Sequence, residues 1–292
     1  MFKSKLFLTV VAAGLATAVF AQPYVQVQAG YAFATSADVR GTTNVTTGTG
    51  ATAVTTSENI YGTGGSGIGF GAAFGYGLSE HISAQLGVAY GINSQVTAQA
   101  SNADAKTSSK TTSSGTQLRL IPALVLSTGK EGLAPYARFG LILPVAGTGL
   151  TTIEATTATG SSKNEYTSAG QFSVGFNSAL GVAFNINDKI AIFGEAEVSS
   201  LTIKGKSLTW TKGESTDASG KVTNSLENAK AASTVRNYVD KLDGTTKDYF
   251  GASPTLLTLV DPTYDQSKAS TALAPMSNNN SVGINIGVRI KF

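Results

Sequence analysis

The stretch Gly67–Leu78, GIGFGAAFGYGL, decides the fold expected of this chain. Its even-numbered positions all carry apolar side chains, and its odd-numbered positions hold only glycine or alanine. A β-strand sends successive side chains to opposite faces. The stretch therefore predicts a strand with one apolar face and one nearly bare face.

The same two-residue alternation recurs along the chain and predicts eight strands in total. They are 24–34, 67–78, 82–93, 116–126, 133–145, 171–186, 190–200 and 281–292. Lengths of about 10–12 residues suit strands that cross a membrane at a tilt. Pro122 lies inside one of them, and because proline cannot donate a ladder hydrogen bond we expect a bulge or local defect there.

The connections between these strands alternate between short turns and long loops. The long ones are roughly 38–66, 94–115, 146–170 and 204–280. An even strand number with short turns on one side and long loops on the other is the pattern of a transmembrane barrel. We predict an all-β fold, an eight-stranded antiparallel up-and-down barrel with periplasmic termini. The loops are rich in Thr, Ser, Gly and Ala, so we expect them to be solvated and flexible.

The fourth loop, about 204–280, leaves several alternatives open. Apolar residues at helical spacing within 225–242 predict a helix. The apolar patch Thr255–Val260 could pack on that helix or plug the barrel mouth. The loop could equally be only partly ordered, or add two strands and give a wider, ten-stranded barrel.

Composition supports a barrel over a soluble sandwich. Charged residues make up 13% of the chain, against about 25% in soluble domains. The outer face of a soluble sandwich would carry charge, whereas the polar faces here hold mainly Gly, Ala, Ser and Gln. There is no cysteine, which excludes disulfides and thiolate metal sites.

The first 21 residues have the composition of a secretory signal. Lys3 and Lys5 precede an apolar run, Leu6–Phe20, that is too short for a mature transmembrane helix. We expect cleavage after Ala21 and a single barrel domain from 22 to 292; the alternative is an N-terminal membrane anchor. Cleavage removes two lysines and leaves a net charge of about +1, which gives no electrostatic footprint for nucleic acid.

Several segments resemble the small outer-membrane barrels of the OmpA, OmpX, OmpW and opacity type. They are Gly69–Leu78 running into Ile82–Tyr90, then Pro135–Gly140, Leu180–Phe184 and Val288–Phe292. The resemblance covers most strands and none of the loops. It implies a bacterial outer-membrane location, and it implies that Phe292 ends the signal read by the barrel assembly machinery.

Large polar and charged residues occupy inward positions on four strands. They are Arg119, Tyr136, Arg138, Glu195, Glu197 and Arg289. An eight-stranded barrel is just wide enough for side chains to fill it, and buried charges persist when paired. We predict a lumen salt-bridge cluster with Arg289 closer to the periplasmic end. Its role is structural in the first interpretation and permeation in the second.

The chain lacks the usual parts of an enzyme site. Its single histidine, His81, falls in a predicted periplasmic turn, so serine chemistry lacks its usual base. We predict no enzyme, no cofactor and no metal site. Lys204, Lys206 and Lys212 share one parity above the membrane, and we expect them either to solubilise the surface or to contact lipopolysaccharide phosphates.

These features favour a monomeric structural or surface-interaction barrel, held in outer-membrane lipid, with a side-chain-filled lumen and loops that meet an extracellular partner. The alternative is a narrow porin, or a conduit for small hydrophobic molecules. The glycine-lined inner faces of 67–78, 82–93 and 171–186 keep that alternative open.

Overall fold

The computed structural model describes residues 22–35, 39–129, 132–227, 229–242, 246–252, 263 and 265–292. The predicted signal segment and the patch Thr255–Val260 lie outside the described residues. Within the described chain, eight long strands form a closed ring. They are β1 (Pro23–Ala34), β4 (Gly67–Gly77), β5 (Ile82–Asn102), β6 (Thr107–Ser127), β7 (Leu133–Thr157), β9 (Gly175–Asn185), β10 (Ile190–Ser200) and β16 (Ser281–Lys291).

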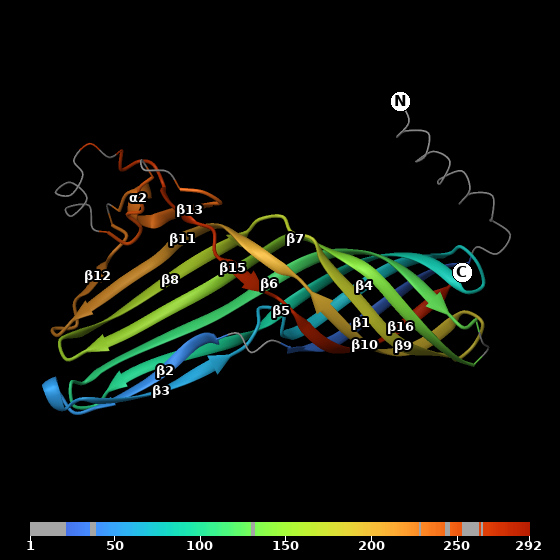
Figure 1. The fold of residues 1–292 in the computed structure, drawn as a ribbon, viewed down its shortest axis with the longest axis horizontal. Coiled ribbons are helices and arrows are strands. Elements are labelled where there is room, and N and C mark those ends of the chain that lie inside the picture. Colours follow the sequence, from blue (N-terminus) through green and yellow to red (C-terminus); the bar gives the residue numbers. More distant parts are fainter. Residues whose placement is uncertain are drawn as a thin grey trace.

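The ring closes because β1 pairs with both β4 and β16 (Figure 1). All eight neighbouring pairs of the ring are antiparallel. At the closing seam Tyr24 is opposite Lys291 and Ala34 is opposite Ser281. The predicted eight-stranded antiparallel barrel is confirmed.

The two-residue alternation decides which side chains face outward. Phe70, Leu180 and Ile286 lie on the outside and expose 51%, 71% and 68% of their surface. Similar apolar residues surround the ring, and a belt of this kind needs hydrocarbon around it. The belt therefore identifies the ring as the membrane-spanning part.

Helices contribute little to the described structure. No helix in the described part of the chain is long and apolar enough to cross a membrane.

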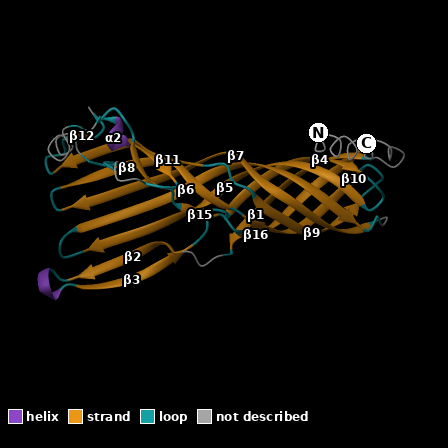
Figure 2. Cartoon of the chain, turned by 45° about the horizontal axis from the view of Figure 1, so that its top comes forward, coloured by secondary structure: helices purple, strands orange, loops and turns teal. Residues whose placement is uncertain are grey.

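The long connections are paired β-ribbons, so the prediction of flexible loops is wrong. β5 and β6 continue past the ring to a turn at 103–106, and β7 turns back into β8 (Gly160–Gly170). β2 (Val39–Thr47) and β3 (Val54–Tyr61) form a further hairpin, with a short 3-10 helix at Gly50–Thr52. These ribbons project from one end of the barrel, away from both described chain ends (Figure 2). Threonine favours strands, and the β5–β6 ribbon extends a ladder that the barrel has already aligned.

The predicted helix over 225–242 is also wrong. Among its described residues the only helical part is α2 (Ala231–Thr234), and β13 (Val235–Val239) follows at once. β13 pairs with β11 (Thr202–Asp217) and, in parallel, with β14 (Ser270–Leu273). Ladder pairing of this kind satisfies the backbone where one isolated helical turn would leave it largely unpaired.

The described residues of the fourth connection add no strand to the closed ring, which makes the ten-stranded alternative wrong. Two more short strands of this connection, β12 (Val222–Asn224) and β15 (Met276–Asn278), pair with β11 as well. β11 itself continues from β10 above the ring and pairs with β8. The extra strands therefore join the sheet that the ribbons and β11 form beyond the ring, called the extracellular sheet after its predicted orientation, and they leave the lumen at eight-strand width.

Pro122 produces a local defect, as the sequence predicts. Leu120 pairs with Leu143, and Ala123 pairs with Gly140 in the same register, but the ladder is interrupted between them. The register shift lies slightly higher, between Leu118 and Arg119. The defect therefore costs local hydrogen bonds and does not change the register.

Candidate functional site

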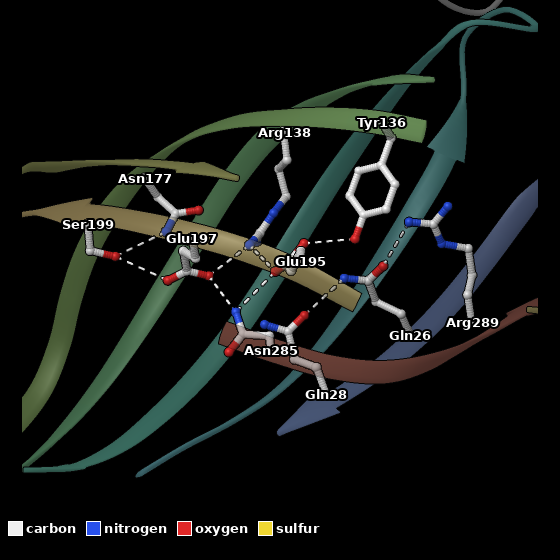
Figure 3. A network of polar contacts seen from close by, with 10 residues as sticks. All are labelled: Gln26, Gln28, Tyr136, Arg138, Asn177, Glu195, Glu197, Ser199, Asn285 and Arg289. Atoms are coloured by element: carbon white, nitrogen blue, oxygen red, sulfur yellow. Dashed lines mark hydrogen bonds and ion pairs between the residues drawn. The ribbon is translucent and has the colours of Figure 1, made fainter. Parts of the chain in front are cut away.

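An ion-pair network inside the lumen joins β7 to β10, which are separated in the ring by β9 (Figure 3). Arg138 Nη2 lies 2.6 Å from Glu195 Oε1 and 2.8 Å from Glu197 Oε2. The hydroxyl of Tyr136 donates to Glu195 Oε2 at 2.9 Å. Arg138 and Glu195 are only 3% and 4% exposed. One guanidinium thus serves two carboxylates inside the barrel, which is the condition under which buried charges are stable.

Amide and hydroxyl groups complete this network. Asn285 Nδ2 donates to Glu195 Oε1 at 3.1 Å and to Glu197 Oε2 at 2.9 Å. Ser199 Oγ donates to Glu197 Oε1 at 3.1 Å and accepts from Asn177 Nδ2 at 3.1 Å. The sequence analysis did not select Asn285, Ser199 or Asn177 as site residues. Their inward-facing positions on the predicted strands would have identified them.

Arg289 forms a second cluster, made of aromatic rings. Its guanidinium carbon lies 4.6 Å from the ring centroid of Tyr24, 5.3 Å from that of Tyr136 and 5.8 Å from that of Phe193. Its Nη2 donates to Gln26 Oε1 at 3.3 Å. Cation–π contacts of this kind stabilise a desolvated guanidinium without a carboxylate. The pairing of β1 with β16 places Arg289 near the ends of the chain.

Arg119 does not join the ion pairs around Arg138. Its Nε donates to Gln117 Oε1 at 2.5 Å, and no described carboxylate lies within salt-bridge distance. On β7 the partner of Arg119 is Pro144, six residues beyond Arg138. Barrel closure staggers the strands against one another, so the prediction that Arg119 joins the salt-bridge cluster is wrong.

A cavity of about 720 Å³ lies above the network, where the ribbons leave the ring. Hydroxyl, amide and glycine residues form most of its wall, and Arg40 is the one charged residue among its described lining residues. Gln117, next to Arg119 in sequence and in hydrogen bonding, also lines it. The lumen therefore opens above the ion-pair network into a polar chamber.

The wall of this chamber has a gap in its ladder. β7 pairs with β9 up to Ile142–Gly175 and with β8 only from Gly149–Ser168. The predicted strand 171–186 begins only at Gly175, and residues 171–174 are not in a strand. Phe172, within that break, lines the cavity and is 72% exposed. The chamber thus borders the lipid-facing side of the wall at this point.

The three lysines lie on β11, and two of them have acidic partners. Lys204 Nζ lies 2.9 Å from Asp240 Oδ1, and Lys212 Nζ lies 3.2 Å from Glu214 Oε1. Register shifts fall between Gly205 and Ser207 and again between Trp210 and Lys212. A single two-residue parity therefore does not hold along this strand, and two of the three charges are already partly neutralised.

His81 lies in the exposed turn between β4 and β5. Its Nδ1 is 3.2 Å from the carbonyl oxygen of Ser127. That turn is at the same end of the barrel as the described chain ends, since Gly77 donates to the carbonyl of Gln22. The histidine is therefore remote from both the ion-pair network and the cavity.

Comparisons with known proteins give distant structural likenesses. No protein-family model matches the chain, and no curated protein matches its sequence. Neisserial surface protein A is similar in structure with a TM-score of 0.34 and 13% identity, over 92% of this chain and 97% of the other. The outer membrane protein OprG from Pseudomonas aeruginosa has a TM-score of 0.40 and 12% identity, over 94% and 96%. Likenesses this distant carry nothing about function.

The class of the protein follows from its own geometry. A closed antiparallel ring leaves no strand edge unpaired in the hydrocarbon, and an apolar belt with a polar interior is the arrangement of outer-membrane barrels. This is a small β-barrel of the outer-membrane class, with an extended sheet beyond the ring.

Proposed function

We propose that the protein is a structural and surface-interaction barrel that presents its extracellular sheet to partners and does not conduct. The ion-pair network of Arg138 with Glu195 and Glu197 carries the proposal, because it joins β7 to β10 past β9 and occupies this side of the lumen with buried side chains. Salt-bridged, hydrogen-bonded side chains in an eight-stranded barrel obstruct a continuous water path.

The surroundings proposed for the barrel are those of a monomer in outer-membrane lipid. Phe292 would end the segment read by the assembly machinery, and Lys206 is the lysine most available for lipopolysaccharide phosphates, since Lys204 and Lys212 have acidic neighbours. The extracellular sheet would contact an extracellular partner. The proposal includes no catalytic step, cofactor or nucleic acid.

Single-channel recording of the refolded mature chain in a planar bilayer tests the filled lumen. We expect no steady conductance from the wild type. The variant Arg138→Ala with Glu195→Ala and Glu197→Ala empties the middle of the lumen and should conduct, which shows that the assay can detect an open barrel. A steady wild-type conductance would overturn the proposal.

A second candidate, a conduit for small hydrophobic molecules, is favoured by one observation. The 720 Å³ cavity lies beside the gap in the β7 ladder, between the last pair of β7 with β9 and its first pair with β8. Binding of an apolar fluorescent probe to the protein in liposomes tests it. Ser113→Trp should fill the cavity and abolish binding, whereas Thr112→Trp, on the adjacent position outside the cavity lining, should not. Equal binding by wild type and Ser113→Trp would remove this candidate.

A further inference from the structure

We propose that the free edge of β3 pairs antiparallel with β3 of a second copy held in a facing membrane. This inference deepens the surface-interaction role, rests on it, and names its partner as the same chain. Its basis is the unpaired edge of β3 in the extracellular sheet, and it specifies one register for the antiparallel pairing of the two copies.

The outer edge of β3 is unpartnered in the described structure. β3 pairs with β2 along its length, from Val39–Tyr61 to Thr47–Val54. In the strand order of the sheet β3 stands at the end, and no other described strand pairs with it. An edge strand presents a row of unused N–H and C=O groups that can accept another strand.

The usual protection of an edge strand is nearly absent here. Natural sheets guard such edges with lysine, proline or a covering segment. β3 has the sequence VTTSENIY, with one charge, Glu58, and neither lysine nor proline. Val54 and Tyr61 are 65% and 57% exposed. The strand therefore has both the backbone groups and the side chains of a pairing surface.

The position of β3 selects a partner in a facing membrane. β2 and β3 run close to the long axis of the molecule, at the end remote from the C-terminus (Figure 1). Copies in one membrane all point their ribbons the same way and would bring two β3 edges together in parallel. A parallel ladder aligns residues of opposite parity, so two β3 strands that meet through the same edge in parallel cannot be related by a two-fold axis, whereas an antiparallel pair can. Antiparallel pairing places the two barrels at opposite ends of the complex.

The antiparallel register follows from backbone parity. Successive residues of a strand turn their N–H and C=O groups to opposite edges, so two copies paired through the same edge align residues of equal parity. With Ser57 opposite itself, Val54 faces Ile60 and Glu58 faces Thr56. Shifts to the two neighbouring allowed registers place Glu58 opposite Glu58 or opposite Val54. The sequence of β3 therefore favours the register centred on Ser57.

A contact of one strand pair is weak on its own. It buries far less surface than a stable protein–protein interface requires. Many copies on two facing surfaces engage together, and multivalency then raises the overall affinity without new contacts. The expected readout is the clustering of membranes that contain the protein, with no stable dimer in dilute detergent.

Cysteine crosslinking tests the register. The chain has no cysteine, so Ser57→Cys introduces the only thiol. Antiparallel neighbours have Cα atoms about 4.5–5.5 Å apart, within the range of a disulfide. Two liposome populations with differently tagged protein are mixed and then oxidised. We expect disulfide dimers that carry both tags for Ser57→Cys, and none for Ser219→Cys in the exposed turn after β11. Dimers confined to one population, or none, would overturn the inference.

Charge variants of β3 test the same contact by clustering. The double variant V54K with I60K places like charges opposite each other and should reduce liposome clustering at least tenfold. V54K with I60E places opposite charges there and should restore it. Thr156→Lys, on the exposed tip of the β7–β8 ribbon, serves as the control and should change little. Clustering that survives V54K with I60K would overturn the inference.

The two proposals fail in different ways. Wild-type liposomes that neither cluster nor conduct would overturn β3 self-pairing and leave the non-conducting barrel in place. Steady conductance would overturn the filled barrel whatever the clustering shows. Amide protection of β3 that appears only on addition of a different protein would assign the edge to that partner and overturn self-pairing.

Discussion

The barrel and the extracellular sheet use the same strands in two different solvents. β5, β6 and β7 cross the membrane and then continue as ribbons for many residues. In the membrane half their outward side chains are apolar, and their inward side chains are small or join buried networks. In the ribbon half Thr and Ser occupy both faces. Backbone pairing therefore sets the shape of both halves, whereas buried side chains contribute to stability mainly in the lumen.

The largest expected effect comes from removing the central cation of the lumen. Arg138→Met leaves Glu195 and Glu197 without a counterion, and breaking a buried pair in this way costs about 3–5 kcal/mol. Urea unfolding of the refolded protein in lipid measures it. Glu195→Gln, which keeps hydrogen bonding, should lower stability less and leave conductance unchanged. A conductance increase in Glu195→Gln would contradict the filled lumen.

The next largest effect on stability distinguishes two glycines of the barrel wall. A Cβ at Gly181 would lie 2.4 Å from the Tyr136 ring, whereas a Cβ at Gly91 would meet nothing within 4 Å. Gly181→Ala should therefore cost about 1–3 kcal/mol through overpacking, and Gly91→Ala should cost little. Thermal unfolding of both variants measures the difference. Equal losses would mean that the aromatic cluster around Arg289 can move freely.

A smaller effect is expected from shortening a ribbon. Replacement of residues 98–111 by Asn-Gly closes the β5–β6 ribbon with a tight hairpin turn below its tip. The ring ladders stay intact, so the thermal midpoint of the barrel should change little. Heat-modified migration on gels checks whether the barrel still folds. Loss of folding would show that the ribbon helps to align the ring.

The smallest effect concerns an exposed ion pair of the extracellular sheet. Lys163 Nζ lies 3.3 Å from Glu154 Oε1, and the hydrogen bond to Glu154 raises the pKa of Lys163 above its usual value. A raised pKa means that the stabilisation is fully present below the lysine pKa of the unfolded chain. It is lost as pH rises through the folded pKa.

Lys163→Met measures this exposed pair. Its unfolding midpoint should lie slightly below that of the wild type near neutral pH, and the two should converge once pH passes the lysine range of about 10–11. Urea unfolding at both pH values provides the test. A loss as large as that of Arg138→Met would contradict the contrast between the two halves.

The sequence by itself determined the barrel. Alternation in segments such as Gly67–Leu78 fixes which side chains face lipid, and only a closed ring satisfies the backbone between two such faces. The inward parity of Arg138 and Glu195 also follows from sequence, because strand period does not depend on neighbours. The interruption of the ladder at Pro122 also follows from sequence, because proline lacks the N–H that a ladder hydrogen bond needs.

The positions of the lumen residues along the barrel axis and the form of the long connections depend on the tertiary structure, and the sequence did not predict them. Arg119 lies away from the ion pairs because barrel stagger is a property of the closed ring. Residues 225–242 have helical spacing, yet β13 pairs with β11 because a neighbouring ladder outweighs local pattern. The Thr- and Ser-rich continuations of β5, β6 and β7 look unstructured by composition, and they are paired because the barrel delivers their strands already aligned.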